Sequence, residues 1–268
     1  MTAVTSQDPV RNPAARTADR PVLPLLRRGL AAGGPAGLAA GLFSLLLAEP
    51  LMDRAIAQEA ERHAHAHDAT GVTAHHEELF SRGTQHFGLV VTAVVVGLAL
   101  GVFFAVAYAL LHRSGALTER PWNRSLLLAG AGFTALSLLP GLRYPANPPG
   151  VGDGGTVQER QVLWLAALAV GVLGMLLARQ LHRRLADREA PVRQLAVAGV
   201  VVATGAALFL LPGNPDPVPV DARLLWDFRM LSLASHAVLW AALGIAFGLL
   251  GLRAARAAGA GGAAGKGT

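Results

Sequence analysis

The chain has 268 residues, of which 53% are hydrophobic and 15% charged, and its formal net charge is +6. Soluble domains usually carry about a quarter charged residues, so the composition argues against a soluble protein. The chain has no cysteine, which excludes disulfides and thiolate metal sites and leaves nitrogen and oxygen to hold any metal. The isoelectric point near 11.1 comes from arginine. We attribute it to membrane topology and expect no nucleic-acid partner.

The hydrophobic residues gather in runs long enough to cross about 30 Å of hydrocarbon at about 1.5 Å per residue. Six uncharged runs lie at Leu30–Ala48, Phe87–Leu111, Ser125–Leu142, Val162–Ala178, Leu195–Leu211 and Met230–Leu252. They predict an all-α integral membrane protein with about six transmembrane helices in contact with membrane lipid. The first run ends in Glu49-Pro50 rather than in a small-residue cleavage site, which indicates an anchor and not a removed signal peptide.

The distribution of basic residues predicts the orientation of these helices. Sixteen of the 23 basic residues lie in the two tails and in the loops after the second and fourth runs. Because Lys and Arg are retained on the cytoplasmic side, both termini are expected inside a bacterial inner membrane. We expect a disordered cytoplasmic tail at 1–27, a transmembrane domain at 28–252 with an outward-facing His-rich loop at 49–86, and a flexible Gly/Ala-rich cytoplasmic tail at 253–268.

Glycines recur at intervals of four in the first run, and shorter pairs recur in two other runs. The positions are Gly29, Gly33, Gly37 and Gly41, then Gly97 and Gly101, then Gly244 and Gly248. A glycine stripe on one helix face lets a neighbouring backbone approach closely, which favours ordinary helix packing. The alternative is a gate at which helices slide.

Similar segments follow the third and fifth runs. Both "LLPGLRYPANPPGVGD" and "LLPGNPDPVPVD" continue from Leu-Leu-Pro-Gly through Asn-Pro and a Pro-rich stretch to an Asp. The second and third helix pairs therefore look like parallel repeats, with Glu49-Pro50 at the matching place in a diverged first pair. Free carbonyls of Pro-rich backbone, with the side-chain oxygens of Asn147, Asp153, Asn214 and Asp221, predict an oxygen-lined mouth. Stiff turns with helix-capping Asn and Asp are the alternative.

Five of the nine histidines lie within fourteen positions, in "HAHAHDATGVTAHH". They are His63, His65, His67, His75 and His76. Imidazole binds Co²⁺, Ni²⁺ and Zn²⁺ well, and a His-rich tract is typical of metal binding. The tract lacks the fixed spacing of a closed site, which favours low-affinity capture. A solvated loop and a pH-sensitive surface are the alternatives.

Two further histidines and one carboxylate complete the candidate metal ligands. His86 begins the second run, Glu49 ends the first, and His236 lies about two turns inside the sixth run. An ionisable group within hydrocarbon is costly, which makes His236 a functional hypothesis. The alternative is a neutral imidazole hydrogen-bonded to a neighbouring helix, with Ser232 or Ser235 assisting.

The Pro-rich segments also carry a family resemblance. With Tyr144–Pro149 followed by Val151-Gly152-Asp153, and with Glu49-Pro50, Gln85–Leu89 and Asn214-Pro215, the chain resembles CbtA-type proteins over residues 28–252. Those proteins are proposed membrane subunits of a cobalt transporter. The resemblance implies cobalt uptake connected with cobalamin synthesis, and a small single-span, His-bearing partner subunit of CbtB type.

We therefore expect a cobalt transporter subunit that moves Co²⁺ inward, with Ni²⁺ as an alternative ion. The outer histidines would collect the ion, and Glu49 with the loop oxygens would replace part of its water shell. His86 or His236 would follow. The sequence has no Walker A motif, dinucleotide fingerprint or Ser-His-Asp context, so we expect no enzyme and no tightly bound cofactor. A non-transporting metal-binding or scaffold subunit of a larger complex is the alternative function.

Overall fold

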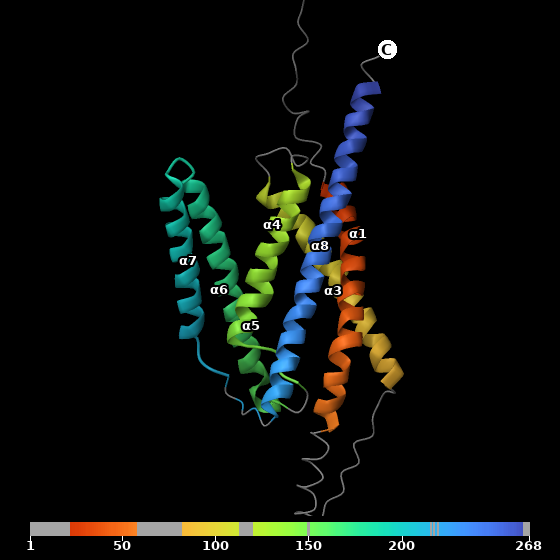
Figure 1. The fold of residues 1–268 in the computed structure, drawn as a ribbon, viewed down its shortest axis with the longest axis vertical. Helices are drawn as coiled ribbons and strands as arrows, with labels where there is room; N and C mark the ends of the chain where they lie inside the picture. Colours follow the sequence, from red (N-terminus) through yellow and green to blue (C-terminus); the bar gives the residue numbers. More distant parts are fainter. Residues whose placement is uncertain are drawn as a thin grey trace, which may run out of the picture.

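The computed structural model describes residues 22–57, 82–112, 120–148, 151–214, 216, 218 and 220–264. These residues are helices and short connections, and none of them forms a strand. Six helical stretches are long and apolar enough to cross a membrane: Val22–Ala57, Gly83–Leu111, Pro121–Arg143, Gly154–Arg184, Ala190–Leu210 and Ala222–Ala257. The predicted all-α fold with six spans is therefore confirmed (Figure 1).

The elements follow one another in an up-and-down order. They are α1 (Val22–Phe43), the π-helical segment η2 (Ser44–Ala48), α3 (Arg82–Leu111), α4 (Pro121–Phe133), the π-helical segment η3 (Thr134–Leu138), α5 (Leu139–Arg143), the 3₁₀ turn η4 (Gly154–Thr156), α6 (Val157–Arg184), α7 (Ala190–Leu210) and α8 (Ala222–Ala264). The helix of α1 and η2 continues to Ala57.

The described chain begins and ends at the same end of the bundle, which we call the terminal end. The opposite end, which carries the Pro-rich segments and Ala57, is called the loop end (Figure 1). Three helix ends lie beyond the boundaries expected for the tails and the His-rich loop. Helix α1 begins at Val22 inside the expected tail, the first helix continues through Glu49 to Ala57, and α8 continues past Leu252 to Ala264. An uncharged run marks only the part of a helix within hydrocarbon, and helices continue into water where propensity allows.

Two prolines explain the two π-helical segments. Pro50 and Pro140 each lie two residues beyond the end of a π segment. A proline within a helix has no N–H for the carbonyl four residues earlier, and its ring crowds that carbonyl. The chain responds with one wide turn, in which the N–H of Glu49 bonds to the carbonyl of Ser44 and that of Leu139 to the carbonyl of Thr134.

The glycine stripe forms the closest helix contact in the described bundle, between α1 and α3. Gly33 on α1 packs directly on the backbone of Gly97 on α3, and Gly29 packs on Gly101. A Cβ at Gly97 would lie 2.6 Å from the Cα of Gly37. The packing interpretation of the stripe is therefore confirmed, because only glycine allows this approach.

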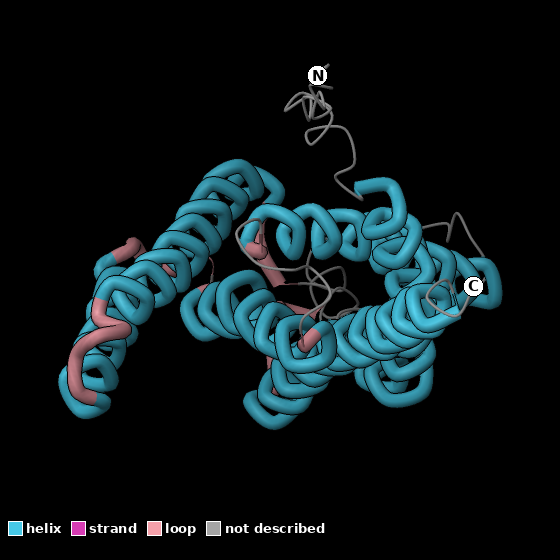
Figure 2. The backbone as a smooth tube through the Cα atoms, turned by 90° about the horizontal axis from the view of Figure 1, so that it is seen from above, coloured by secondary structure: helices cyan, strands magenta, loops and turns pink. Residues whose placement is uncertain are grey.

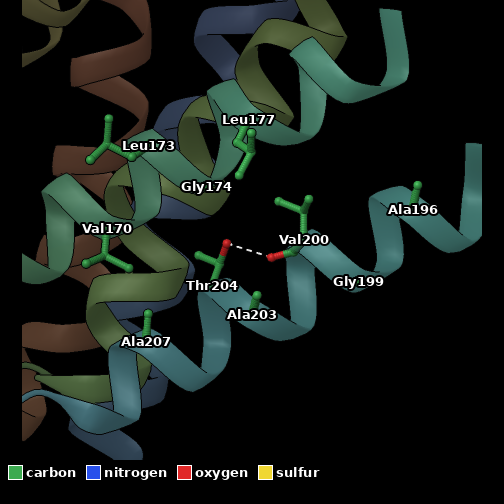
Figure 3. Close-up of a pocket in the computed structure, with 10 residues that line it drawn as sticks. All are labelled: Val170, Leu173, Gly174, Leu177, Ala196, Gly199, Val200, Ala203, Thr204 and Ala207. Carbon is green, nitrogen blue, oxygen red and sulfur yellow. Dashed lines mark hydrogen bonds between the residues drawn. The ribbon is translucent and has the colours of Figure 1, made fainter. Parts of the chain in front are cut away.

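Helix α8 packs against both α1 and α4. Gly244 and Gly248 on α8 adjoin Ala129 and Ser125 on α4, and the Trp240 ring adjoins Gly132. The pair α6 and α7 lies to one side of this group (Figures 1 and 2). An apolar groove of about 470 Å³ runs between α6 and α7, and Thr204 beside it donates a hydrogen bond of 2.8 Å to the carbonyl of Val200 (Figure 3).

The contact of α1 with α3 predicts a position-dependent cost for added methyl groups. Gly97→Ala is expected to lower the free energy of unfolding by about 1–3 kcal/mol, the usual range for overpacking. Gly88→Ala is the matched control on the same helix, because a Cβ there meets nothing within 4 Å. The measurement is the thermal unfolding midpoint in detergent, followed by tryptophan fluorescence. Equal midpoints for the two variants would contradict the packing argument.

Candidate metal site at the loop end

Glu49 and His86 lie side by side at the loop end. Glu49 follows η2 on the first helix, and His86 lies one turn into α3. Their Oε1 and Nε2 atoms are 3.1 Å apart. The carboxylate is largely buried, with 11% of its side chain exposed, and the imidazole is half-open, with 38% exposed. The close packing of α1 on α3 determines this juxtaposition.

A carboxylate and an imidazole on neighbouring helices are two ligands of the kind that Co²⁺ accepts. The open face of His86 leaves one side of the pair accessible from the loop end. Two ligands do not close a coordination shell, and no group of three or more His, Asp or Glu suited to a metal occurs among the described residues. The pair therefore corresponds to a partial site that needs further donors.

The predicted histidines of the loop lie outside the described residues. These are His63, His65, His67, His75 and His76. The segment that contains them, residues 58–81, joins Ala57 to Arg82 in the sequence. The described pair Glu49 and His86 is therefore located on the two helices that this segment connects.

The two Pro-rich segments meet each other, as their similarity suggested. Thr156 donates a hydrogen bond of 2.7 Å to Oδ1 of Asp216, and the Arg160 guanidinium lies 3.2 Å from Oδ2. The Tyr144 hydroxyl donates to the carbonyl of Pro212 at 2.7 Å. Arg143 also donates to the carbonyl of Leu211. These bonds hold the loop after the third span to the loop after the fifth.

The four residues of the predicted mouth all accept hydrogen bonds, three of them from nearby backbone N–H groups. Asn147 Oδ1 accepts from Arg229 at 2.9 Å, and Asn214 Oδ1 accepts from the Asp216 N–H at 3.4 Å. Asp153 Oδ1 accepts from the Gly155 N–H at 2.6 Å, and Asp221 Oδ1 accepts from the N–H groups of Arg223 and Leu224, each at 3.0 Å. Asp153 and Asp221 thus cap η4 and α8, as the alternative interpretation expected. Their role as metal ligands stays a prediction.

Asp216 is the residue that sequence reasoning missed. Its side chain is 2% exposed, which makes it a buried carboxylate paired with Arg160. Gly152 adjoins this pair with a φ of +108°, a conformation that favours glycine, and a Cβ there would collide with the Arg160 guanidinium. The only sequence signal was an acid between two prolines, in "NPDPVP", which ordinarily indicates an exposed turn.

His236 lies in the first half of α8 and is exposed, although its helix packs on α1 and α4. Its neighbour Ser235 shares a hydrogen bond of 2.8 Å with Ser44 in η2. Further along the helix, the Trp240 indole donates at 3.1 Å to the hydroxyl of Ser137 in η3. Both interpretations of His236, as a functional group and as an imidazole hydrogen-bonded to a neighbouring helix, stay predictions.

Packing is dense at the terminal end. Phe247 is fully buried against Phe104 and Tyr108, with ring centroids 4.9 and 5.2 Å away. The Arg28 guanidinium lies 3.7 Å from the Phe247 centroid, and its Nε donates to the Phe247 carbonyl at 2.6 Å. Burial lowers the pKa of His112, next to this cluster, below its usual value, so the ring is neutral at pH 7. Aromatic rings of α3 and α8 and the Arg28 guanidinium thus pack together at this end.

A family model described as "Probable cobalt transporter subunit (CbtA)" matches residues 23–251 of the chain. The match includes nearly all of the six helical stretches that could span a membrane. No curated protein matches the chain, and no solved structure matches it either.

The ion pair of Arg160 on α6 with the buried Asp216 of the second Pro-rich segment predicts a stability effect. Asp216→Asn keeps an oxygen for Thr156 but removes the charge that faces Arg160, so we expect unfolding to become easier by about 1–3 kcal/mol. Asp187→Asn, at an exposed position in the turn before α7, is the control. Thermal midpoints in detergent measure both changes. A midpoint for Asp216→Asn as high as that of the control would show that the pair contributes nothing.

Proposed function

The chain belongs to the CbtA family of probable cobalt transporter subunits, and from this membership we propose that it moves Co²⁺ inward across a bacterial cytoplasmic membrane. The six apolar helices support a multi-pass membrane protein in contact with lipid. The excess of basic residues at the terminal end supports a cytoplasmic position for that end. The loop end, with Glu49 and His86, is then the side on which Co²⁺ arrives.

The single observation that carries the proposal is the pairing of Glu49 with His86 at 3.1 Å. Its two side chains supply one carboxylate and one imidazole, and the segment between their helices supplies five more imidazoles. We propose that the loop histidines collect the hydrated ion and pass it to this pair. Weak, successive sites suit transport because an ion held too firmly would not leave.

The Pro-rich segments take a second role in this proposal. Asp153 and Asp221 each use one carboxylate oxygen as a helix cap, and a carboxylate has further acceptor capacity. The side-chain oxygens of Asn147 and Asn214 also accept one hydrogen bond each and can accept a further contact. We expect these residues to contribute transient oxygen contacts to the ion, secondary to Glu49 and His86.

The ion and the partners follow from the same chemistry. Nitrogen and oxygen ligands bind Ni²⁺ at least as well as Co²⁺, so Ni²⁺ is expected to compete. No Walker A motif occurs in the chain, and energy for transport would come from elsewhere. A small single-span, His-bearing subunit of CbtB type is the proposed partner.

The packed terminal end favours a second candidate function. Phe247 is fully buried at that end, against aromatic rings and the Arg28 guanidinium, and a transporter has to open a passage through this packing. A non-transporting subunit that binds metal, or that serves as a scaffold in a larger complex, would need no such passage. Uptake measurements separate the two functions.

The test is accumulation of radioactive Co²⁺ in cells without their own cobalt importers. Cells that express the chain with a CbtB-type subunit are compared with cells that carry an empty vector, and Ni²⁺ is added as competitor. Saturable uptake above the vector supports the transporter. If folded, membrane-inserted protein gives no uptake, the scaffold function replaces it.

Within this assay, Glu49→Gln and His86→Ala are expected to reduce uptake at low Co²⁺ by about tenfold or more, the scale for disturbing a metal site. The amide keeps the shape of the side chain but removes the negative charge that attracts the ion. Glu159→Gln, at an exposed position near the start of α6, is the control. Unchanged uptake in both Glu49→Gln and His86→Ala would exclude the pair as the capture site.

A further inference from the structure

We propose that His236, with the hydroxyls of Ser44, Ser137 and Ser235, forms a second cation-binding step within the membrane. The step lies between α8 and the two π-helical segments. This inference rests on the proposed transport of Co²⁺. It adds a binding site that the ion would reach after Glu49 and His86. It also assigns a role to η2 and η3, which the capture site at the loop end leaves unexplained.

The two π segments have the same construction. Each spans five residues, and each is followed after one intervening residue by a proline, Pro50 or Pro140. Those prolines cannot donate to the carbonyls of Leu46 and Leu136, four residues earlier. At membrane depth, polar backbone without its helical donor is tolerated where it is buried in protein or lines a watery space. Wide turns of this kind occur frequently at functional sites.

Both π segments direct a hydroxyl at α8, from two different helices. Ser44 in η2 reaches Ser235 at 2.8 Å, and Ser137 in η3 reaches Trp240 at 3.1 Å. Ser137 and Trp240 are buried, with 9% and 7% of their surfaces exposed. Hydroxyl oxygens accept as well as donate, so each has capacity for a cation beside its present partner.

His236 lies on α8 between these two contacts. Successive residues of a helix are about 100° apart around its axis. Around the axis of α8, His236 is therefore about 100° from Ser235 in one direction and about 40° from Trp240 in the other. Ile245, nine residues later, is about 180° away and is 43% exposed on the outside of the bundle. His236 therefore lies on the inward face of α8, yet it is exposed. The helices packed on α8 leave it uncovered.

The side chains of this cluster suit transient binding of an ion better than tight binding. An imidazole is an acceptable ligand for Co²⁺, and hydroxyl oxygens can accept contacts from the ion or from its water shell. None of the six uncharged runs contains a carboxylate to neutralise the ion, and burying an unneutralised charge is costly. The ion would thus keep part of its water shell and bind weakly, which allows it to leave.

The first measurement is Co²⁺ binding to purified full-length protein in detergent, in the Glu49→Gln background that weakens the outer pair. We expect a residual weak site there. Adding His236→Ala should abolish it, and adding Ser44→Ala with Ser137→Ala should weaken it by about tenfold. Thr204→Val is the control, because Thr204 also bonds within a membrane helix but lies beside the α6–α7 groove. His236→Gln keeps a neutral polar group of similar size and serves if the alanine variant does not fold.

The second measurement is uptake by the same His236 and serine variants with Glu49 intact. The inference expects maximal Co²⁺ uptake to fall below about a tenth of the unsubstituted value, while binding at the outer pair stays unchanged. Unchanged binding in the first measurement and unchanged uptake in the second would overturn the second cation-binding step. The proposed transport function would not be affected by that result. Absence of uptake by the unsubstituted protein would instead remove the proposed function, and the second cation-binding step with it.

Discussion

The contact between the backbones of α1 and α3 is the constraint on which the rest of the bundle depends. Gly33 against Gly97 and Gly29 against Gly101 leave no room for side chains, so the two helices have one relative register. That register places Glu49, within the loop-end part of the first helix, beside His86, near the start of α3. Two ligands on consecutive spans become a pair because the helices approach closely along the glycine stripe.

A second constraint comes from the hydrogen bonds that helices need within hydrocarbon. Pro50 and Pro140 interrupt those bonds near the loop end, and the chain absorbs each interruption in a π-helical turn. The two turns place Ser44 beside Ser235 and Ser137 beside Trp240, both on α8. The same spacing from proline in the first and third spans supports the proposed relation between the first and second helix pairs.

Much of this arrangement could be predicted from the sequence, and the limits have physical causes. The six apolar runs predicted the six helices because a long uncharged run has no other stable structure in a membrane. The glycine stripe predicted a close contact, but it did not say with which helix. Asp153 and Asp221 were recognisable as candidate helix caps. Asp216 was not recognised, because burial of an acid between prolines depends on Arg160, 56 positions away in the sequence.

The sequence by itself determined the membrane class, the number of spans and the candidate ligands, since these depend on composition and on short-range spacing. Tertiary structure alone decided which candidates meet. Glu49 pairs with His86, Asp216 pairs with Arg160, and Ser235, next to His236 in the sequence, bonds to Ser44 on another helix. Helical periodicity gives each residue a face on its own helix, but the partner on that face is set by packing between helices, and local spacing contains no information about it.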